Sequence, residues 1–175
     1  LDTGLSAWNL AMGSQELYDW LDAEPQLFHP GDLDYIHSVE RISKLSNVIS
    51  INGGVQLDLM GQENAESTGT RQLSGVGGQM DFLEGAYRSK GGKGFICINS
   101  SRVTKDGERK SNILATIPGG STISAPRTMI QYVATEYGIA SLSGKTLRER
   151  AEAMASIAHP DFREELMKYA QENFK

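Results

Sequence analysis

The chain has 175 residues, of which 39% are hydrophobic and 22% are charged, and its formal net charge is −5. This length and composition suit one soluble globular domain with a sizeable core. The negative charge, without a cluster of Lys and Arg, argues against nucleic-acid binding, and no apolar run approaches the roughly 20 residues of a membrane span or forms a signal peptide.

The chain opens without an initiator Met, and we interpret its start either as a cut inside a longer protein or as a processed end. Residues 5–12 are predicted to form a first strand. Ser14 is a candidate helix N-cap, because Leu17, Trp20 and Leu21 follow it at the spacing of one helix face.

The polar connection after this helix contains His29 and His37. Neither has a cysteine or a third histidine nearby, so we interpret both as surface or packing residues rather than metal ligands, and we predict no metal site. The spacing of Val39, Ile42 and Leu45 predicts one or two further helical turns.

Two strand patterns flank the segment Asn52-Gly53-Gly54. Residues 48–51 form an apolar run, and the alternation of apolar and polar residues over 55–59 predicts a half-buried strand. The segment between them has two interpretations. In the first, it is a hairpin turn, because Asn-Gly and Gly-Gly accept positive φ angles. In the second, the side-chain amide of Asn52 binds a ligand or a catalytic carboxylate.

The residues from Ser74 to Phe82 form the most distinctive stretch, because three glycines fall within four positions and helical spacing begins directly afterwards. Such a loop is either a tight structural turn or a cradle for a phosphate, carboxylate or oxyanion at a helix N-terminus. Of the 19 glycines, 11 lie between Gly53 and Gly94, so we expect the functional site in this middle third.

The apolar run 95–98 predicts a buried strand, and we expect Cys97, the single cysteine, to be a reduced core residue rather than a nucleophile. One cysteine excludes an intrachain disulfide and fits the cytoplasm. Residues 105–110 form a charged surface loop, and further strands are expected at 113–117 and 122–124.

Tyr132–Thr135 is predicted as the last strand, so Glu136 lies at its carboxyl end. In open α/β sheets this end is where sites are built. A carboxylate at such a position is either a structural group or a site residue.

The C-terminal part is predicted to be helical scaffold. Thr146 and Glu149 have the spacing of a capping box, and an apolar stripe follows them. His159 and Pro160 separate this helix from a second one whose buried face contains Phe162, Leu166 and Tyr169. His159 is therefore interpreted as a helix-junction residue. Strands separated by helices predict one α/β domain with a mainly parallel sheet.

Four segments in this order resemble the C-terminal domain of the acetyl-CoA hydrolase/transferase family, which includes the 4-hydroxybutyrate and butyrate:acetate CoA-transferases. They are SINGGVQLDLMGQ (50–62), GVGGQMDF (75–82), VATEYGIA (133–140) and AHPDFR (158–163). The resemblance covers about residues 8–170 and is nearer to the 4-hydroxybutyrate and butyrate branch than to the succinyl branch. It implies a CoA-transferase (NagB/RpiA-like) architecture for residues 1–175, with an N-terminal domain absent from this chain.

The resemblance also implies a set of site residues. Asn52 and Glu136 match polar positions beside the catalytic nucleophile, and the loop facing the CoA thioester corresponds to Gly75, Val76, Gly77, Gly78 and Gln79. The family's nucleophilic glutamate belongs upstream of this chain. Glu84 is expected on a helix surface, and Glu63 and Glu66 in a loop, so none is assigned as the nucleophile.

Three functions follow as hypotheses. The chain is half of a CoA-transferase that uses a glutamyl-CoA thioester, part of an acetyl-CoA hydrolase, or a standalone acyl-CoA-binding module. The expected partners are an acyl-CoA, a short-chain carboxylate and the N-terminal domain, with a homo-oligomer as a further possibility.

Overall fold

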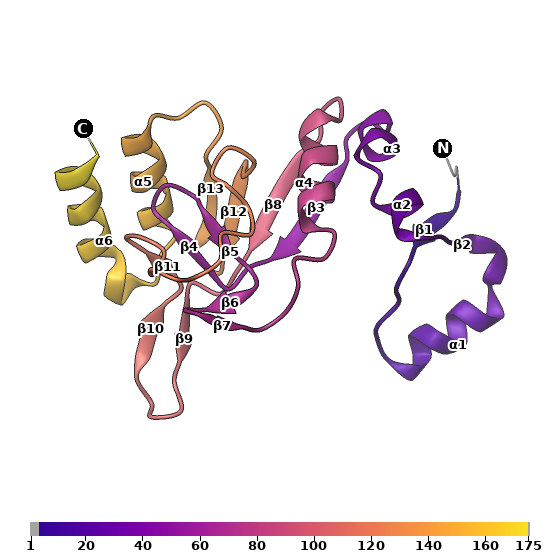
Figure 1. Cartoon of the computed structure of the whole chain (residues 1–175), viewed down its shortest axis with the longest axis horizontal. Helices are drawn as coiled ribbons and strands as arrows, with labels where there is room; N and C mark the ends of the chain where they lie inside the picture. Colours follow the sequence, from indigo (N-terminus) through magenta and orange to yellow (C-terminus); the bar gives the residue numbers. More distant parts are fainter. Residues whose placement is uncertain (1–3, 175) are drawn as a thin grey trace.

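The computed structural model describes residues 4–174, and its centre is a four-stranded sheet (Figure 1). The strand order is β13 (Gly138–Ser141), β12 (Tyr132–Thr135), β8 (Lys93–Cys97) and β3 (Ile49–Gly53). The strands β3, β8 and β12 pair in parallel, and β13 pairs with β12 in antiparallel fashion. This confirms the predicted α/β class with a mainly parallel sheet, although β13 is one strand more than predicted.

A second, smaller sheet lies beside the ends of these strands (Figure 1). Its order is β11 (Ile113–Leu114), β4 (Gln56–Asp58) and β5 (Glu63–Asn64). Two short antiparallel pairs complete this part: β6 (Ser67–Thr68) with β7 (Arg71–Gln72), and β9 (Ser101–Val103) with β10 (Arg109–Ser111). The β9–β10 hairpin contains the predicted charged loop and projects from the domain (Figure 1).

The N-terminal part forms a separate extension at one side of the sheet (Figure 1). It contains the parallel pair β1 (Ser6–Trp8) and β2 (Phe28–Pro30), the helices α1 (Gln15–Ala23) and α2 (Leu33–Ile36), and the 3-10 turn η1 (Pro25–Leu27). The first strand is therefore shorter than predicted. Helix α3 (Val39–Lys44) then leads into β3, as the spacing predicts.

The three larger helices are α4 (Gln79–Arg88), α5 (Leu147–Ser156) and α6 (Pro160–Asn173). They share one hydrophobic core with the sheet, in which Leu83, Met154 and Leu166 of the helices join Ile96 and Val133 of the strands. Within residues 4–174, no helix combines the length and the apolar composition needed to cross a bilayer.

The opposite face of the central sheet is largely uncovered. Ile51 is 71% exposed and Ile139 is 63% exposed, while Phe95 and Tyr132 stack with 4.9 Å between their ring centroids. Parallel sheets normally carry helices on both faces, so an apolar face without a cover is unusual. We call this surface the open sheet face, and it consists of Ile49, Ile51, Phe95, Cys97, Tyr132 and Ile139.

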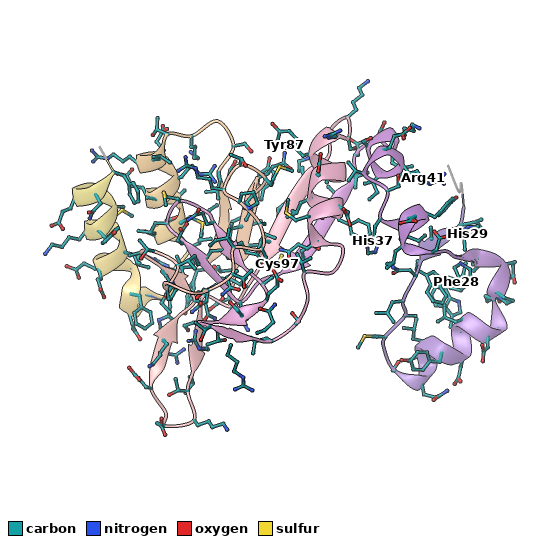
Figure 2. All side chains as sticks on the ribbon, in the orientation of Figure 1. Phe28, His29, His37, Arg41, Tyr87 and Cys97 are labelled. Carbon is teal, nitrogen blue, oxygen red and sulfur yellow. The ribbon has the colours of Figure 1, made fainter. Side chains whose placement is uncertain are left out.

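The prediction that Cys97 is buried is wrong, because its side chain is exposed. Successive side chains in a strand point to opposite faces. Ile96 and Ile98 of this segment are directed into the core, and Cys97 therefore lies on the open sheet face (Figure 2).

The hairpin interpretation of Asn52-Gly53-Gly54 is also wrong. Asn52 and Gly53 belong to β3, which pairs with β8, whereas the next strand, β4, belongs to the other sheet. The chain passes from one sheet to the other here, so no reversal occurs. All of β4 is buried, contrary to the half-buried pattern predicted, and residues 122–124 do not form a strand.

The capping box at the start of α5 is confirmed. The Thr146 hydroxyl accepts a hydrogen bond from the Glu149 backbone amide at 3.3 Å, and the Glu149 carboxylate accepts one from the Thr146 amide at 2.8 Å. Two N–H groups that the helix cannot satisfy internally are thereby paired.

We predict that Thr146→Ala lowers the free energy of unfolding by about 1 kcal/mol, because the cap hydroxyl is lost. Urea denaturation measures this difference. Thr128→Ala is the matched control, because Thr128 is exposed in a turn and its replacement should change stability by less than about 0.5 kcal/mol. Equal effects of the two changes would contradict a stabilising role for the capping box.

Candidate functional site

The carboxyl ends of β3, β8 and β12 lie at one edge of the central sheet, because these strands are parallel and adjacent. A cavity of about 410 Å³ opens there, lined by Gly54, Cys97, Ile98, Asn99, Ala134 and Thr135. Ligands of open α/β sheets bind outside this edge. The edge is therefore the candidate functional site.

Glu136 follows β12 at this edge and is held in place by Ser100. The Ser100 backbone amide donates to one carboxylate oxygen at 2.9 Å, and its hydroxyl donates to the other at 2.6 Å. Burial raises the pKa of Glu136, but the hydrogen bonds from Ser100 and the charge of His159 outweigh it, so the pKa lies below its usual value. Glu136 is thus an oriented, ionised carboxylate that remains exposed to solvent.

Sequence reasoning did not identify Ser100. Glu136 was considered because polar residues just beyond a strand's carboxyl end are candidate site residues. The same reasoning applies to β8, because Asn99 and Ser100 follow Ile98 just beyond the end of that strand. The two residues therefore carried a positional signal that could have been used.

Asn52 is half-buried near the end of β3, and its side-chain amide donates to the Ser50 hydroxyl at 2.8 Å. Strand β8 lies between β3 and β12, which separates Asn52 from Glu136 by two strand spacings, or about 10 Å. The structure therefore places both residues at one edge without a direct contact between them.

The glycine loop (Gly75, Val76, Gly77, Gly78 and Gln79) leads into α4, with Gly78 as the N-cap. Gly77 has a φ angle of +59°, which favours glycine over any side chain with a Cβ atom. Gly75, Val76 and Gly77 are exposed, so the unpaired N–H groups at the start of α4 face an accessible surface. The predicted loop-to-helix transition is confirmed.

His37 packs against the other side of this loop, beside α4 (Figure 2). Its Nδ1 atom is 3.6 Å from a carboxylate oxygen of Asp81, its Nε2 atom is 3.1 Å from the Asn9 amide, and a side chain on Gly78 would collide with its ring. Within residues 4–174, no three His, Cys, Asp or Glu side chains gather closely enough to hold a metal ion. His37 therefore has contacts typical of a packing residue.

Gln79 differs from the rest of the loop because its side chain is buried, with 7% exposed. Its Nε2 atom donates to Oε2 of Glu63 at 2.8 Å. The side chain of Gln79 therefore points into the protein. Only its backbone N–H group can contribute to ligand binding at the start of α4.

The prediction that Glu63 lies in a loop is wrong. Glu63 belongs to β5 and is fully buried, and its Oε1 atom has no hydrogen-bond partner among the described residues. Burial raises the pKa of Glu63 to about 7, against a smaller lowering by the Gln79 hydrogen bond, and the Glu66 charge adds to the increase. The polar sequence around Glu63 gave no signal of this burial.

This pKa shift predicts a pH-dependent stability. The folded state binds the Glu63 proton more tightly than the unfolded state does. The stabilisation of the fold by this bound proton is therefore complete below pH 4.5 and is lost as the pH rises through about 7. Glu63→Gln removes the ionisation, and the variant should exceed the original protein in free energy of unfolding at pH 8 by on the order of 2–3 kcal/mol.

Urea denaturation at about pH 5 and pH 8 measures this effect. Glu84→Gln is the control, because Glu84 pairs with Arg88 on the surface of α4 as expected from the sequence. A difference between Glu63→Gln and the original protein that is the same at both pH values would contradict the assignment.

Residues 13–170 match the family model described as acetyl-CoA hydrolase/transferase C-terminal domain. The chain is 43% identical over 171 residues to butyryl-CoA:acetate CoA-transferase of Anaerostipes caccae, covering 98% of this chain and 38% of that protein. It is 45% identical over 163 residues to 4-hydroxybutyrate coenzyme A transferase of Clostridium kluyveri, covering 93% and 37%.

A solved structure agrees with these sequence matches. RipA from Yersinia pestis has a TM-score of 0.86 and 38% identity, covering 98% of this chain and 38% of RipA. The chain therefore has the architecture predicted from its sequence, and it spans less than two fifths of the length of these relatives.

Proposed function

The chain belongs to the acetyl-CoA hydrolase/transferase family, and on this premise we propose that it is the C-terminal domain of a CoA-transferase. The enzyme moves coenzyme A between an acyl-CoA and a free carboxylate of the butyrate, 4-hydroxybutyrate or acetate class. The names of the similar proteins support this substrate class. Residues 1–175 form the C-terminal domain, and the N-terminal domain is its partner.

One observation carries the proposal. Asn52 near the end of β3 and Glu136 after β12 lie at the edge where the parallel strands end. The last residue of the exposed glycine loop, Gln79, binds Glu63, which packs against Gly54 at this edge, and this supports assigning the loop to the same site. Helix N-termini and oriented amides stabilise negative charge, which develops on the carbonyl oxygen of a thioester when a nucleophile attacks it. The backbone N–H groups of the glycine loop would bind that oxygen.

The proposed reaction is a double displacement. A glutamate carboxylate from the N-terminal part attacks the thioester carbonyl, CoA leaves as a thiolate, and an acyl-glutamyl anhydride forms. The thiolate then attacks the glutamyl carbonyl, which releases the acyl group as a carboxylate and leaves a glutamyl-CoA thioester. A second carboxylate takes the CoA by the reverse steps.

The glutamates near the motifs in this chain are poor candidates for that nucleophile. Glu63 is fully buried, Glu84 pairs with Arg88, and Glu66 accepts a hydrogen bond from Ser124 at 2.6 Å. We therefore assign Asn52 and Glu136 to orientation of the thioester and the nucleophile, and the attacking group to the partner domain.

The open sheet face supports a partner of this kind. Its apolar side chains lie on strands whose other face is packed in the core, and parallel sheets are normally buried on both faces. The relatives have more than half of their length outside the matched region. The remainder of the polypeptide would cover this face, and in its absence the face would favour association between copies.

We predict that Glu136→Gln lowers kcat of the complete enzyme by about 100-fold, because an amide cannot accept both Ser100 hydrogen bonds and carries no charge. Steady-state transfer of CoA from butyryl-CoA to acetate measures the loss, and circular dichroism checks the fold. Glu152→Gln is the matched control, since Glu152 pairs with Arg148 on α5. Unchanged turnover in Glu136→Gln would return Glu136 to a structural role.

We also predict that this chain alone transfers no CoA, because the attacking glutamate is on the partner domain. The chain is incubated with butyryl-CoA and acetate, with and without the N-terminal part added as a separate polypeptide. Acetyl-CoA should form only in the combined sample. Turnover by the chain alone that is lost on changing one of its own glutamates would overturn the assignment.

The same experiment separates the alternatives. A hydrolase releases free CoA from butyryl-CoA without acetate, because water takes the place of the second carboxylate. A binding module binds butyryl-CoA but forms neither free CoA nor acetyl-CoA in the combined sample.

A further inference from the structure

Glu63 is a buried carboxyl group that the proposed reaction does not use, and it lies between two segments of the candidate site. On one side, Oε2 accepts the hydrogen bond from Gln79, the first residue of α4. On the other side, Oε1 lies against Gly54, where a Cβ atom would come within 2.8 Å of it. Gly54 lines the 410 Å³ cavity and follows β3 directly.

The backbone of Glu63 is firmly held, so its side chain can act as a fixed support. Glu63 pairs with Leu57 of β4, its amide donates to the Ala125 carbonyl at 3.0 Å, and its own carbonyl accepts from the Ser124 amide at 2.8 Å. The support is therefore attached to the small sheet, independently of α4.

The same short segment also holds the other end of the glycine loop. The Glu66 carbonyl accepts hydrogen bonds from the amides of Leu73 at 2.7 Å and Ser74 at 3.2 Å. The loop begins directly after Ser74 and ends at Gln79. Residues 63–66 thus anchor the backbone on one side of the loop and the Gln79 side chain on the other.

We propose that Glu63 is a positioning residue, whose carboxyl group binds the first residue of α4, packs against Gly54 at the end of β3 and so orders the glycine loop. Its effect on CoA transfer rests on the proposed function, whereas its effect on loop order does not. Glu63 acts through Gln79 and Gly54 and does not touch the substrate.

The surroundings of Glu63 make this link sensitive to ionisation. Its free oxygen lies beside Gly54, at a point that the side chains of Ile96 and Ile98 also approach. The Gln79 amide faces the other oxygen. Glu66 is the titratable group whose charge acts on it within the part of the chain that the structure describes. Burying a carboxylate with an unpaired oxygen is costly. Ionisation near neutral pH therefore favours a local opening that exposes Glu63 to water and separates the two segments, even though the Gln79 hydrogen bond by itself favours the ionised form.

Hydrogen exchange of the complete protein, followed by mass spectrometry on a peptide covering residues 73–83, tests the proposal. Rates are corrected for the intrinsic effect of pH and compared at about pH 6 and pH 8. In the original protein and in the Glu84→Gln control, we expect the corrected exchange to rise about threefold or more at the higher pH. In Glu63→Gln, which keeps a hydrogen-bonding group but cannot ionise, exchange should stay slow at both values.

Glu63→Leu is the second test variant, because it removes the hydrogen bond to Gln79 at every pH. Its loop should exchange rapidly at both pH values, while a peptide from α6 keeps the original rate and reports an intact fold. Loop exchange in the original protein that does not change with pH, or slow loop exchange in a folded Glu63→Leu protein, overturns the positioning role. A Glu63→Leu protein that does not fold leaves the decision to the Glu63→Gln comparison.

Kinetics separate this inference from the proposed function. In an active enzyme, the decline in kcat/KM for butyryl-CoA between about pH 6 and pH 8 should be smaller in Glu63→Gln than in the original protein. An inactive complete protein with the expected exchange pattern supports the positioning role and rejects the transferase. An active enzyme whose loop exchange is unaffected by Glu63 rejects the positioning role alone.

Discussion

Parallel hydrogen bonding of β8 to both β3 and β12 requires the chain to leave the sheet at the same edge three times, and the candidate site depends on this constraint. The three exits place different side chains at this edge: Asn52 near the end of β3, Ser100 after β8, and Glu136 after β12. The return from the small sheet to β8 runs through the glycine loop and α4, so a helix N-terminus is brought to the same edge.

The two faces of the central sheet have different roles. One face is buried by three helices in a single core, which fixes the strands and the site edge. The other face exposes apolar side chains such as Ile51 and Ile139. A sheet stabilised on one side can remain folded while presenting the other to a partner, and this division agrees with the role proposed above for the chain.

The site also combines two carboxylates in opposite environments. Glu136 is exposed and accepts two hydrogen bonds from Ser100, which hold its pKa low. Glu63 is buried with one oxygen unpaired, and its pKa is raised to about 7. Solvation and hydrogen bonding therefore separate an ionised group at the surface from one that titrates near neutrality inside the protein.

Local signals in the sequence were sufficient for the helices other than α2, for the glycine loop and for the cores of the parallel strands, because capping and periodicity act over a few residues. The positions of Asn52 and Glu136 at strand ends were also predicted, although their roles remain proposals. Only the tertiary structure decided that Cys97 is exposed, that Asn52-Gly53-Gly54 connects two sheets, and that Glu63 is buried against Gln79. Each of these depends on elements distant in sequence, since a strand's buried face and a carboxyl group's environment are set by what packs against them.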